Sequence, residues 1–130
     1  MVVDASDNFE TRFLLNEVCV ELRKPLVSGA AIRMEGQISV FNNTSPQDPC
    51  YRCLYRNEAE LAETCSESGV LSPIVGLIGS IQAIETLKLL ANVGKILSGR
   101  LLIIDAAAME WREIRLKKDP ECPVCSTIIR

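Results

Sequence analysis

The sequence predicts an α/β fold with one mixed β-sheet and helices packed against it. The order of predicted elements along the 130 residues is strand, helix, strand, strand, helix, strand, strand, which is typical of an α/β domain with some antiparallel neighbours. Apolar residues make up 48% of the chain, enough to form the core of one compact domain and too many for a disordered segment. Two Cys-x-x-Cys pairs also predict a link between a mid-chain loop and the C-terminal part of the domain.

The first half of the chain is predicted to contain three strands and a helix. Residues 2–5 are interpreted as the C-terminal end of a buried strand, and residues 6–8 form a turn rich in helix-capping side chains. The following helix ends before Pro25, because the residue before a proline avoids helical backbone angles. Leu26–Ile32 is predicted to be a buried parallel strand, and residues 37–41, where apolar and polar residues alternate, a half-exposed strand. The predicted buried stripe of the helix consists of Leu15, Val18, Cys19 and Leu22.

The second half is predicted to contain the longest helix and two more strands. Residues 58–67 are charged and weakly patterned, which indicates a short helix. Ser72 is predicted to cap the long helix with Pro73 in its first turn, and Gly94 is predicted to end it. A broad apolar surface predicts that most of this helix is buried. The two strands are predicted to pair antiparallel, at residues 101–105 and 111–117.

The pairs Cys50/Cys53 and Cys122/Cys125 stand out in a chain that contains no histidine. A two-residue spacer lets both sulfurs of a pair point at one ion, and two pairs supply the four thiolates of a tetrahedral zinc site. Four thiolates leave no open coordination position, so this zinc is expected to stabilise the fold and to take no part in catalysis. Two disulfides are the alternative, but nothing in the sequence indicates an oxidising compartment.

Charge and hydropathy narrow the functional classes. The net charge of -3 offers no electrostatic attraction for nucleic acid, so we expect no nucleic-acid partner. No secretory leader opens the sequence, and the longest mostly apolar stretch, residues 70–81, is shorter than a membrane span. Gln82, Glu85 and Lys88 interrupt the sequence after that stretch. These observations predict a cytoplasmic protein with no membrane partner.

Several motifs occur in the order that one enzyme family uses. Residues 3–12, V-D-A-S-D-N-F-E-T-R, resemble the D-x-x-D-N-x-x-x-R element of ubiquitin-activating-type adenylyltransferases. Residues 28–37 resemble the strand pair that follows in those enzymes. The two Cys-x-x-Cys pairs resemble their zinc-binding cysteine pairs, here called the zinc claws. Residues 65–73 are similar to their crossover segment. The chain thus resembles the HesA/MoeB/ThiF family over nearly its whole length.

This resemblance implies a Rossmann-like mixed sheet and an ATP- and Mg²⁺-dependent nucleotidyltransferase activity. The implied reaction is adenylation of the C-terminal glycine of a ubiquitin-like sulfur carrier, of MoaD or ThiS type, for molybdopterin or thiamine biosynthesis. Residues 33–37, R-M-E-G-Q, favour the molybdopterin branch. Enzymes of this kind work as dimers, so the resemblance also implies a homodimer.

The resemblance covers only the C-terminal half of such an enzyme, so residues 1–130 are expected to be the C-terminal portion of an adenylyltransferase domain. The sequence has no G-x-G-x-x-G turn, which would present backbone N–H groups to phosphates at a helix N-terminus. Gly76 and Gly79 lie within the apolar helix and are interpreted as sites of close helix packing. We therefore expect this part alone to be an inactive fragment.

Asp7, Asn8 and Arg12 are the predicted nucleotide-site residues. Asp7 and Asn8 follow the C-terminal end of a strand, where ligands bind in open α/β sheets, and a carboxylate there suits a Mg²⁺ ion that bridges phosphates. The resemblance implies this role for Asp7 and a nucleotide contact for Asn8. Helix capping is the structural alternative for both. Arg12 is expected either to reach a phosphate or the substrate tail, or to pair with Asp7 or Glu10.

Two cysteines lie outside the claws. The resemblance places Cys65 at the cysteine proposed to bind the carrier covalently, although Glu63 and Glu67 would disfavour its thiolate. Cys19 lies on the predicted apolar stripe and is expected to be a core residue.

Two other functional classes remain open from the sequence. The first is a non-catalytic, zinc-stabilised interaction module that docks a sulfur carrier, and the second is a redox protein that uses its Cys-x-x-Cys pairs. Metal content separates the redox protein from the others, and carrier-dependent exchange of pyrophosphate into ATP separates the enzyme from the interaction module.

Overall fold

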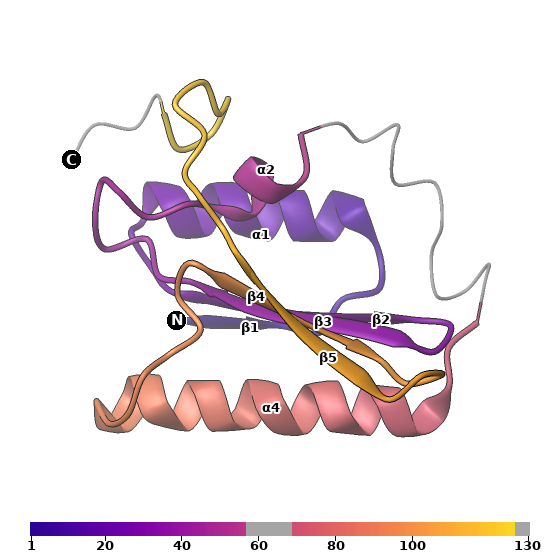
Figure 1. Ribbon diagram of the computed structural model, residues 1–130. Coiled ribbons are helices and arrows are strands. Elements are labelled where there is room, and N and C mark those ends of the chain that lie inside the picture. The colour runs from indigo at the N-terminus through magenta and orange to yellow at the C-terminus, as the bar shows by residue number, and fades with distance from the viewer. Residues whose placement is uncertain (57–68, 127–130) are drawn as a thin grey trace.

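The computed structural model describes residues 1–56 and 69–126 and contains one five-stranded sheet in these ranges (Figure 1). The sheet order follows the chain, β1-β2-β3-β4-β5. The predicted helix at residues 58–67 lies outside the described residues. The elements are β1 Val2–Asp4, α1 Phe9–Glu21, β2 Leu26–Ile32, β3 Glu35–Phe41, α2 Tyr51–Leu54, α4 Ser72–Ala91, β4 Arg100–Asp105 and β5 Glu110–Arg115.

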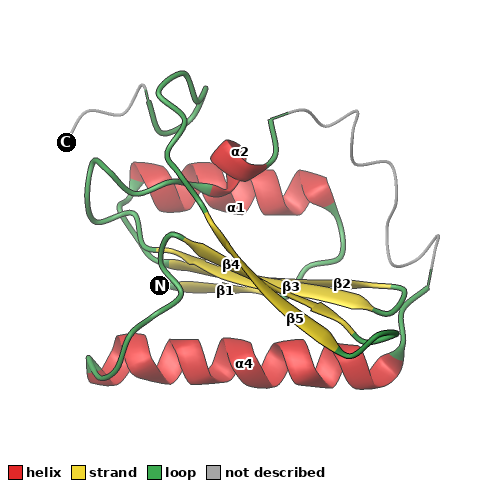
Figure 2. Cartoon of the chain, in the orientation of Figure 1, coloured by secondary structure: helices red, strands yellow, loops and turns green. Residues whose placement is uncertain are grey.

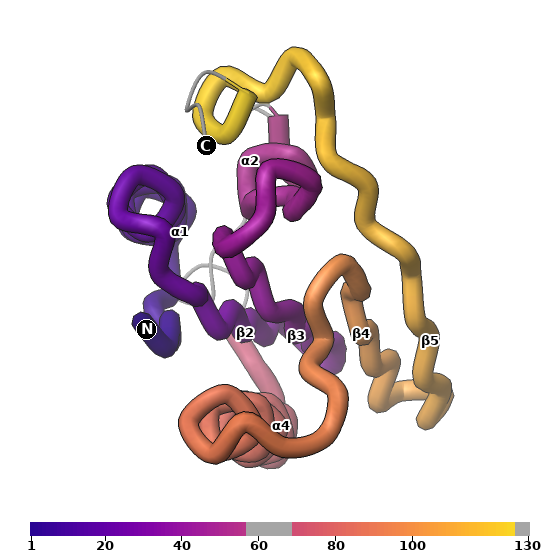
Figure 3. Tube along the Cα trace, turned by 90° about the vertical axis from the view of Figure 1, so that its left-hand side faces the viewer, coloured from indigo at the N-terminus to yellow at the C-terminus, as the bar shows by residue number. Residues whose placement is uncertain are grey.

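The sheet forms the middle layer of the domain (Figures 1 and 2). Helices α1 and α2 cover one face and α4 covers the other. Strand β1 pairs parallel with β2, and each later strand pairs antiparallel with the one before it. The predicted α/β fold with a mixed sheet is therefore confirmed. Figure 3 shows the same layers after a quarter turn, with the C-terminal loop on the α1 side of the sheet.

Helix α1 buries a different face from the predicted one. Val18 and Leu22 are exposed, Leu22 at 58%, so the predicted stripe is wrong at these two positions. Cys19 is buried, as predicted. Apolar spacing alone does not identify the buried face here, because polar side chains with internal partners occupy part of it. The buried residues of α1 are Arg12, Phe13, Asn16, Cys19 and Val20.

Two strands differ in burial from their predictions. Strand β1 is expected to be buried, but Val3 is exposed, because β1 is the edge strand of the described sheet. Strand β3 is expected to be half-exposed, but its last four residues, from Ile38 to Phe41, are all buried. Its pairing with both β2 and β4 places it at the centre of the sheet, between the helices on the two faces.

Helix α4 packs closely over β2 and β3 because two glycines make room for its side chains. A Cβ atom at Gly29 would lie 2.4 Å from Cδ of Gln82, and one at Gly36 would lie 2.5 Å from Cδ1 of Ile78. Gln82 is buried and donates from Nε2 to the carbonyl oxygens of Asp4 (2.7 Å) and Val27 (3.3 Å). The helix is thereby attached to the strand that leads into the predicted nucleotide site.

The ends of α4 differ from the prediction. Leu71 is the N-cap and makes no side-chain capping hydrogen bond, so Ser72 is the first helical residue and not the cap. Asn92 adopts the left-handed conformation at the C-cap, where Gly94 was expected to end the helix. Glu85 is buried near this end and accepts a hydrogen bond from the backbone N–H of Leu97 (2.6 Å), which holds the following loop against the helix.

The outer face of α4 is apolar and exposed, so the prediction that most of the helix is buried is wrong. A Cβ atom at Gly76 or Gly79 would meet no atom of the described chain within 4 Å, so the predicted close helix packing is absent there. By length and composition alone, this 20-residue helix could cross a membrane, but core helices of soluble proteins pass the same test. Of its most apolar 18-residue stretch, 22% is buried within the structure. The large exposed apolar side chains on the helix are Val75, Ile84, Leu87 and Leu90.

Candidate functional site

The four predicted zinc ligands lie together on the α1 side of the sheet. The sulfur atoms of Cys50, Cys53, Cys122 and Cys125 all lie within 4.8 Å of one another. Two sulfur pairs, Cys50–Cys122 and Cys53–Cys125, are 3.6 and 3.5 Å apart. A disulfide requires about 2.05 Å, so the disulfide alternative is wrong for these cysteines. Sulfurs at about 2.3 Å from a tetrahedral ion lie about 3.8 Å from each other, which is close to the spacing observed.

Polar groups around the sulfurs favour thiolates. The backbone N–H groups of Cys50 and Asp119 both donate to Sγ of Cys53, each at 3.4 Å. Asn16, on α1, donates from Nδ2 to Sγ of Cys50 (3.5 Å) and accepts from the N–H of Tyr51 (2.9 Å). N–H donors around thiolates orient the ligands and offset part of their negative charge. The cysteine cluster therefore fits a structural Zn²⁺ site.

The sulfurs differ in their affinity for protons. Interaction with the neighbouring Cys50 thiol lowers the pKa of Cys53 to about 5. The same interaction, together with burial, raises the pKa of Cys50, and burial raises the pKa of Cys125 to about 12. A metal ion binds cysteine sulfurs as thiolates, so its binding is expected to displace the protons of Cys50 and Cys125.

The turn between β1 and α1 positions the predicted nucleotide residues. Asn8 is the N-cap of α1, and its Oδ1 accepts a hydrogen bond from the N–H of Thr11 (2.8 Å). Asp7 is exposed, and its carboxylate accepts a hydrogen bond from Nδ2 of Asn8 (3.2 Å). The capping alternative is therefore confirmed for Asn8, while Asp7 does not cap the helix. The carboxylate of Asp7 remains accessible at the carboxyl end of β1.

Arg12 is the buried cation of this region. Its side chain is only 7% exposed, its guanidinium donates to the carbonyl oxygen of Ser6 (3.0 Å), and it lies 5.0 Å from the ring centre of Phe9. Nε of Arg12 has no hydrogen-bond partner, and no ion pair joins Arg12 to Asp7 or Glu10 in the described part of the chain. The predicted surface pairing of Arg12 is thus not formed. A buried guanidinium without a carboxylate favours binding of an anion.

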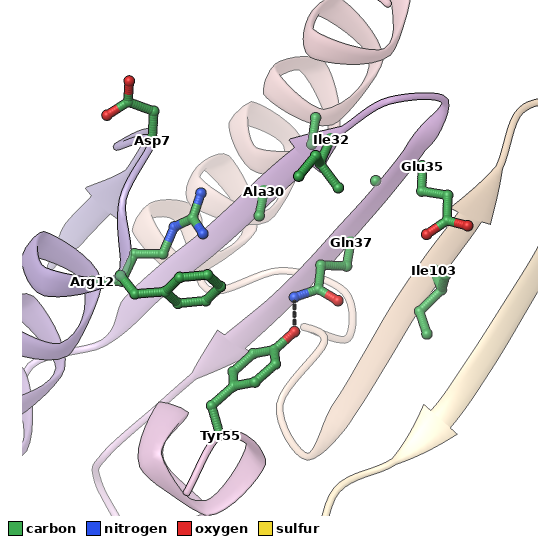
Figure 4. Close-up of a pocket in the computed structure, with 11 residues that line it drawn as sticks. Asp7, Arg12, Ala30, Ile32, Glu35, Gln37, Tyr55 and Ile103 are labelled. Carbon is green, nitrogen blue, oxygen red and sulfur yellow. Dashed lines mark hydrogen bonds between the residues drawn. The ribbon is translucent and has the colours of Figure 1, made fainter. Parts of the chain in front are cut away.

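Asp7 and Arg12 line one pocket above the sheet, while Asn8 does not contribute to it (Figure 4). The pocket has a volume of about 130 Å³, well above the ~10–15 Å³ that one water molecule needs. The start of α1 forms one wall and the end of α2 contributes another residue. The pocket-lining residues are Asp7, Phe9, Arg12, Ala30, Ala31, Ile32, Glu35, Gly36, Gln37, Tyr55 and Ile103.

Some residues of the two sites are absent from the sequence prediction. Tyr55 and Gln37 line the pocket, and Asn16 supports the cysteine cluster. Tyr55 lies two residues after Cys53, and this closeness in sequence is the one signal that could have placed it beside the first cysteine pair. Cys65, the predicted covalent residue, lies outside the described residues, so its role stays a prediction.

The sequence profile of the ThiF family matches residues 1–124. This chain belongs to the ThiF family. It is 50% identical over 125 residues to the molybdopterin-synthase adenylyltransferase of Escherichia coli K12, an alignment that covers 96% of this chain and 50% of that protein. It is 48% identical over 129 residues to adenylyltransferase and sulfurtransferase MOCS3-1 of Drosophila pseudoobscura pseudoobscura, which covers 97% of this chain and 28% of that protein. The chain therefore spans half or less of the length of these relatives.

Solved structures show the same fold. Escherichia coli MccB in complex with MccA-N7isoASN superposes with a TM-score of 0.77 at 14% identity, over 97% of this chain and 40% of MccB. MccB with ATP gives 0.76 at 15% identity, over 97% and 39%. At this low identity the similarity establishes the Rossmann-like fold of the ThiF-family chain and nothing about its ligands.

Proposed function

We propose that this chain is the C-terminal part of an ATP-dependent adenylyltransferase that activates the C-terminal glycine of a ubiquitin-like sulfur carrier. The observation that carries the proposal is the pocket near the carboxyl end of β1 that is lined by both the exposed carboxylate of Asp7 and the buried guanidinium of Arg12. Membership of the ThiF family and 50% identity to a molybdopterin-synthase adenylyltransferase support this reaction.

Asp7 has the chemistry required for a nucleotide-bound cation. Mg²⁺ retains several waters and takes one or two protein carboxylates together with phosphate oxygens, so a single exposed carboxylate at the pocket fits it. The ion supplies charge neutralisation to the phosphates when it is bound. The side chain of Asn8 donates a hydrogen bond to the carboxylate of Asp7 and accepts one from the N–H of Thr11. These two bonds fix the position of Asn8, which we propose as a nucleotide contact.

Arg12 provides a positive charge to the same pocket. In the proposed reaction a carboxylate oxygen of the carrier attacks the α-phosphorus of ATP, the bond to the β-phosphate oxygen breaks, and pyrophosphate leaves. Reactions of this type depend mainly on positioning and charge neutralisation. The cation–π contact with Phe9 and the hydrogen bond to Ser6 hold the guanidinium in place for an anionic substrate group.

The molybdopterin branch is the more strongly supported pathway. The relatives from Escherichia coli and Drosophila are named molybdopterin-synthase adenylyltransferase and MOCS3-1, and the R-M-E-G-Q string at residues 33–37 favours the same branch. We propose a MoaD-type carrier as substrate, with a ThiS-type carrier as the comparison. A covalent step at Cys65 belongs to the same proposal and is not needed for adenylation.

Carrier-dependent exchange of pyrophosphate into ATP tests the proposed reaction. We expect the full-length protein containing this sequence to catalyse exchange with a MoaD-type carrier and to do so less well with a ThiS-type carrier. Residues 1–130 alone are expected to show no exchange, because they contain no Gly-rich turn to bind the phosphates. Lack of exchange by the full-length protein with both carriers would leave the non-catalytic interaction module as the better assignment.

We also propose that the full-length protein forms a homodimer. The exposed apolar face of α4 includes Leu87 at 64% and Leu90 at 69% exposure, and apolar faces of this kind mark association surfaces. Light scattering is expected to give twice the mass of one chain. Leu90→Glu is expected to shift the protein toward monomer while its circular dichroism stays unchanged, since this side chain is exposed among the described residues. A native protein that remains monomeric at high concentration would contradict the proposal.

A further inference from the structure

Part of the pocket wall is formed by a hydrogen-bonded pair of side chains, Tyr55 and Gln37 (Figure 4). Nε2 of Gln37, on β3, donates to the hydroxyl oxygen of Tyr55, which lies at the end of α2. Both residues are half-buried and both line the pocket. This contact joins the sheet to the short helix that carries the first cysteine claw.

Tyr55 is held from several sides. Its ring centre lies 5.0 Å from that of Tyr51 and 5.8 Å from that of Phe9, the second in an edge-to-face arrangement. Its backbone N–H donates to the carbonyl oxygen of Tyr51 (3.1 Å), at the C-cap of α2. The neighbouring Arg56 forms an ion pair with Asp119 (3.0 Å), in the loop that leads to the second claw. These contacts restrict the position of the Tyr55 hydroxyl at the pocket.

Gln37 has unused hydrogen-bonding capacity toward a ligand. Its bond to Tyr55 is the only hydrogen bond of its side chain among the residues that the structure describes. The amide retains its carbonyl oxygen and one N–H, which match the N–H and C=O groups of an extended peptide. Its cross-strand neighbour is Ala30, whose small side chain leaves space on the floor of the pocket.

We propose that Tyr55 is a positioning residue that fixes the amide of Gln37, so that Gln37 binds the peptide backbone of the carrier's C-terminal tail while Arg12 faces the tail's carboxylate end. This inference rests on the proposed adenylation function. A free glutamine side chain loses rotamer freedom when it binds a ligand. Because the hydroxyl of Tyr55 orders Gln37 in advance, it reduces this entropic cost and raises the affinity for the tail.

The test measures binding of a purified MoaD-type carrier to the full-length protein by titration calorimetry without ATP, together with KM values for carrier and ATP in the exchange assay. Tyr55→Phe, which keeps the ring and removes the hydroxyl, is expected to weaken carrier binding about fivefold. Gln37→Ala is expected to weaken it about tenfold. The double variant is expected to match Gln37→Ala, because Tyr55 acts through Gln37. The KM for ATP is expected to stay within about twofold of the native value in all three.

Gln47→Ala is the matched control for Gln37→Ala. Gln47 is exposed in the loop before Cys50 and does not line the pocket, so its replacement is expected to leave carrier affinity unchanged. Thermal melting of each variant reports whether the fold is kept.

Several results would overturn the inference. They are native carrier affinity in Tyr55→Phe, equal losses in Gln47→Ala and Gln37→Ala, a double variant weaker than Gln37→Ala, or a matching rise in the KM for ATP. A native protein that does not bind the carrier would overturn both this inference and the proposed function. A native protein that binds the carrier with the expected variant pattern but exchanges no pyrophosphate would overturn the proposed function and leave the pocket assignment in place.

Discussion

Asp7→Ala in the full-length protein is expected to reduce carrier adenylation by about 100- to 1,000-fold while leaving the stability of the fold nearly unchanged. The proposed role of Asp7 is to hold a cation on the phosphates, and removal of such a group reduces the rate as well as nucleotide affinity. Its side chain is exposed and makes no capping bond to α1, so the loss of stability is expected to stay below about 0.5 kcal/mol. Turnover and thermal midpoint, measured on the same preparation, check both expectations.

Asn8→Ala is the companion variant because Asn8 supplies the cap that Asp7 lacks. Loss of its bond to the N–H of Thr11 is expected to destabilise the fold by about 1 kcal/mol. Asp7→Asn keeps a hydrogen-bond acceptor and removes the charge, so it is expected to be almost as slow as Asp7→Ala. Normal turnover in Asp7→Ala with a lowered thermal midpoint would assign the residue a structural role instead.

Removal of the metal is the second change expected to have a large effect. Purified protein is expected to contain about one zinc ion per chain, bound by the four clustered cysteines. Because metal-binding energy contributes to folding, chelation is expected to lower the thermal midpoint by on the order of 10 °C or more. The loss of stability is expected to be largest in α1, α2 and the C-terminal loop, since Asn16 forms hydrogen bonds with both Cys50 and the backbone of Tyr51. Hydrogen exchange at the N–H groups of Tyr51 and Asp119 would locate it.

Cys122→Ser is expected to reproduce the effect of chelation, whereas Cys19→Ala serves as the control. Cys19 is a buried thiol of α1 outside the cysteine cluster, so its loss is expected to cost packing energy but to leave the zinc content unchanged. A metal-free protein with the native thermal midpoint, or a disulfide between Cys50 and Cys53, would refute the zinc assignment.

The sequence by itself determined the features that depend on local spacing. The two-residue spacers of the cysteine pairs bring the sulfurs of each pair together whatever surrounds them, so the ligand set of the candidate zinc site was predictable. The order of strands and helices, and the placement of Asp7 and Asn8 in the turn after β1, were predictable for the same reason. A turn after a strand restricts where its side chains can lie, so the neighbourhood of Asp7 followed from a few adjacent residues.

Only the tertiary structure decided which faces are buried and which distant side chains meet. Apolar spacing selected Val18 and Leu22 as core residues of α1, but the helix turns Arg12 and Asn16 inward, because each finds hydrogen-bond partners there. The pair formed by Tyr55 and Gln37 joins residues from a metal-claw helix and a sheet strand, and nothing in their sequence spacing predicts that contact. The exposure of one face of α4 was equally unpredictable. An apolar helix face has the same sequence pattern whether it packs inside its own domain or against another chain. Burial and long-range contacts depend on how whole elements pack against each other, and that information is spread over the chain rather than contained in any one motif.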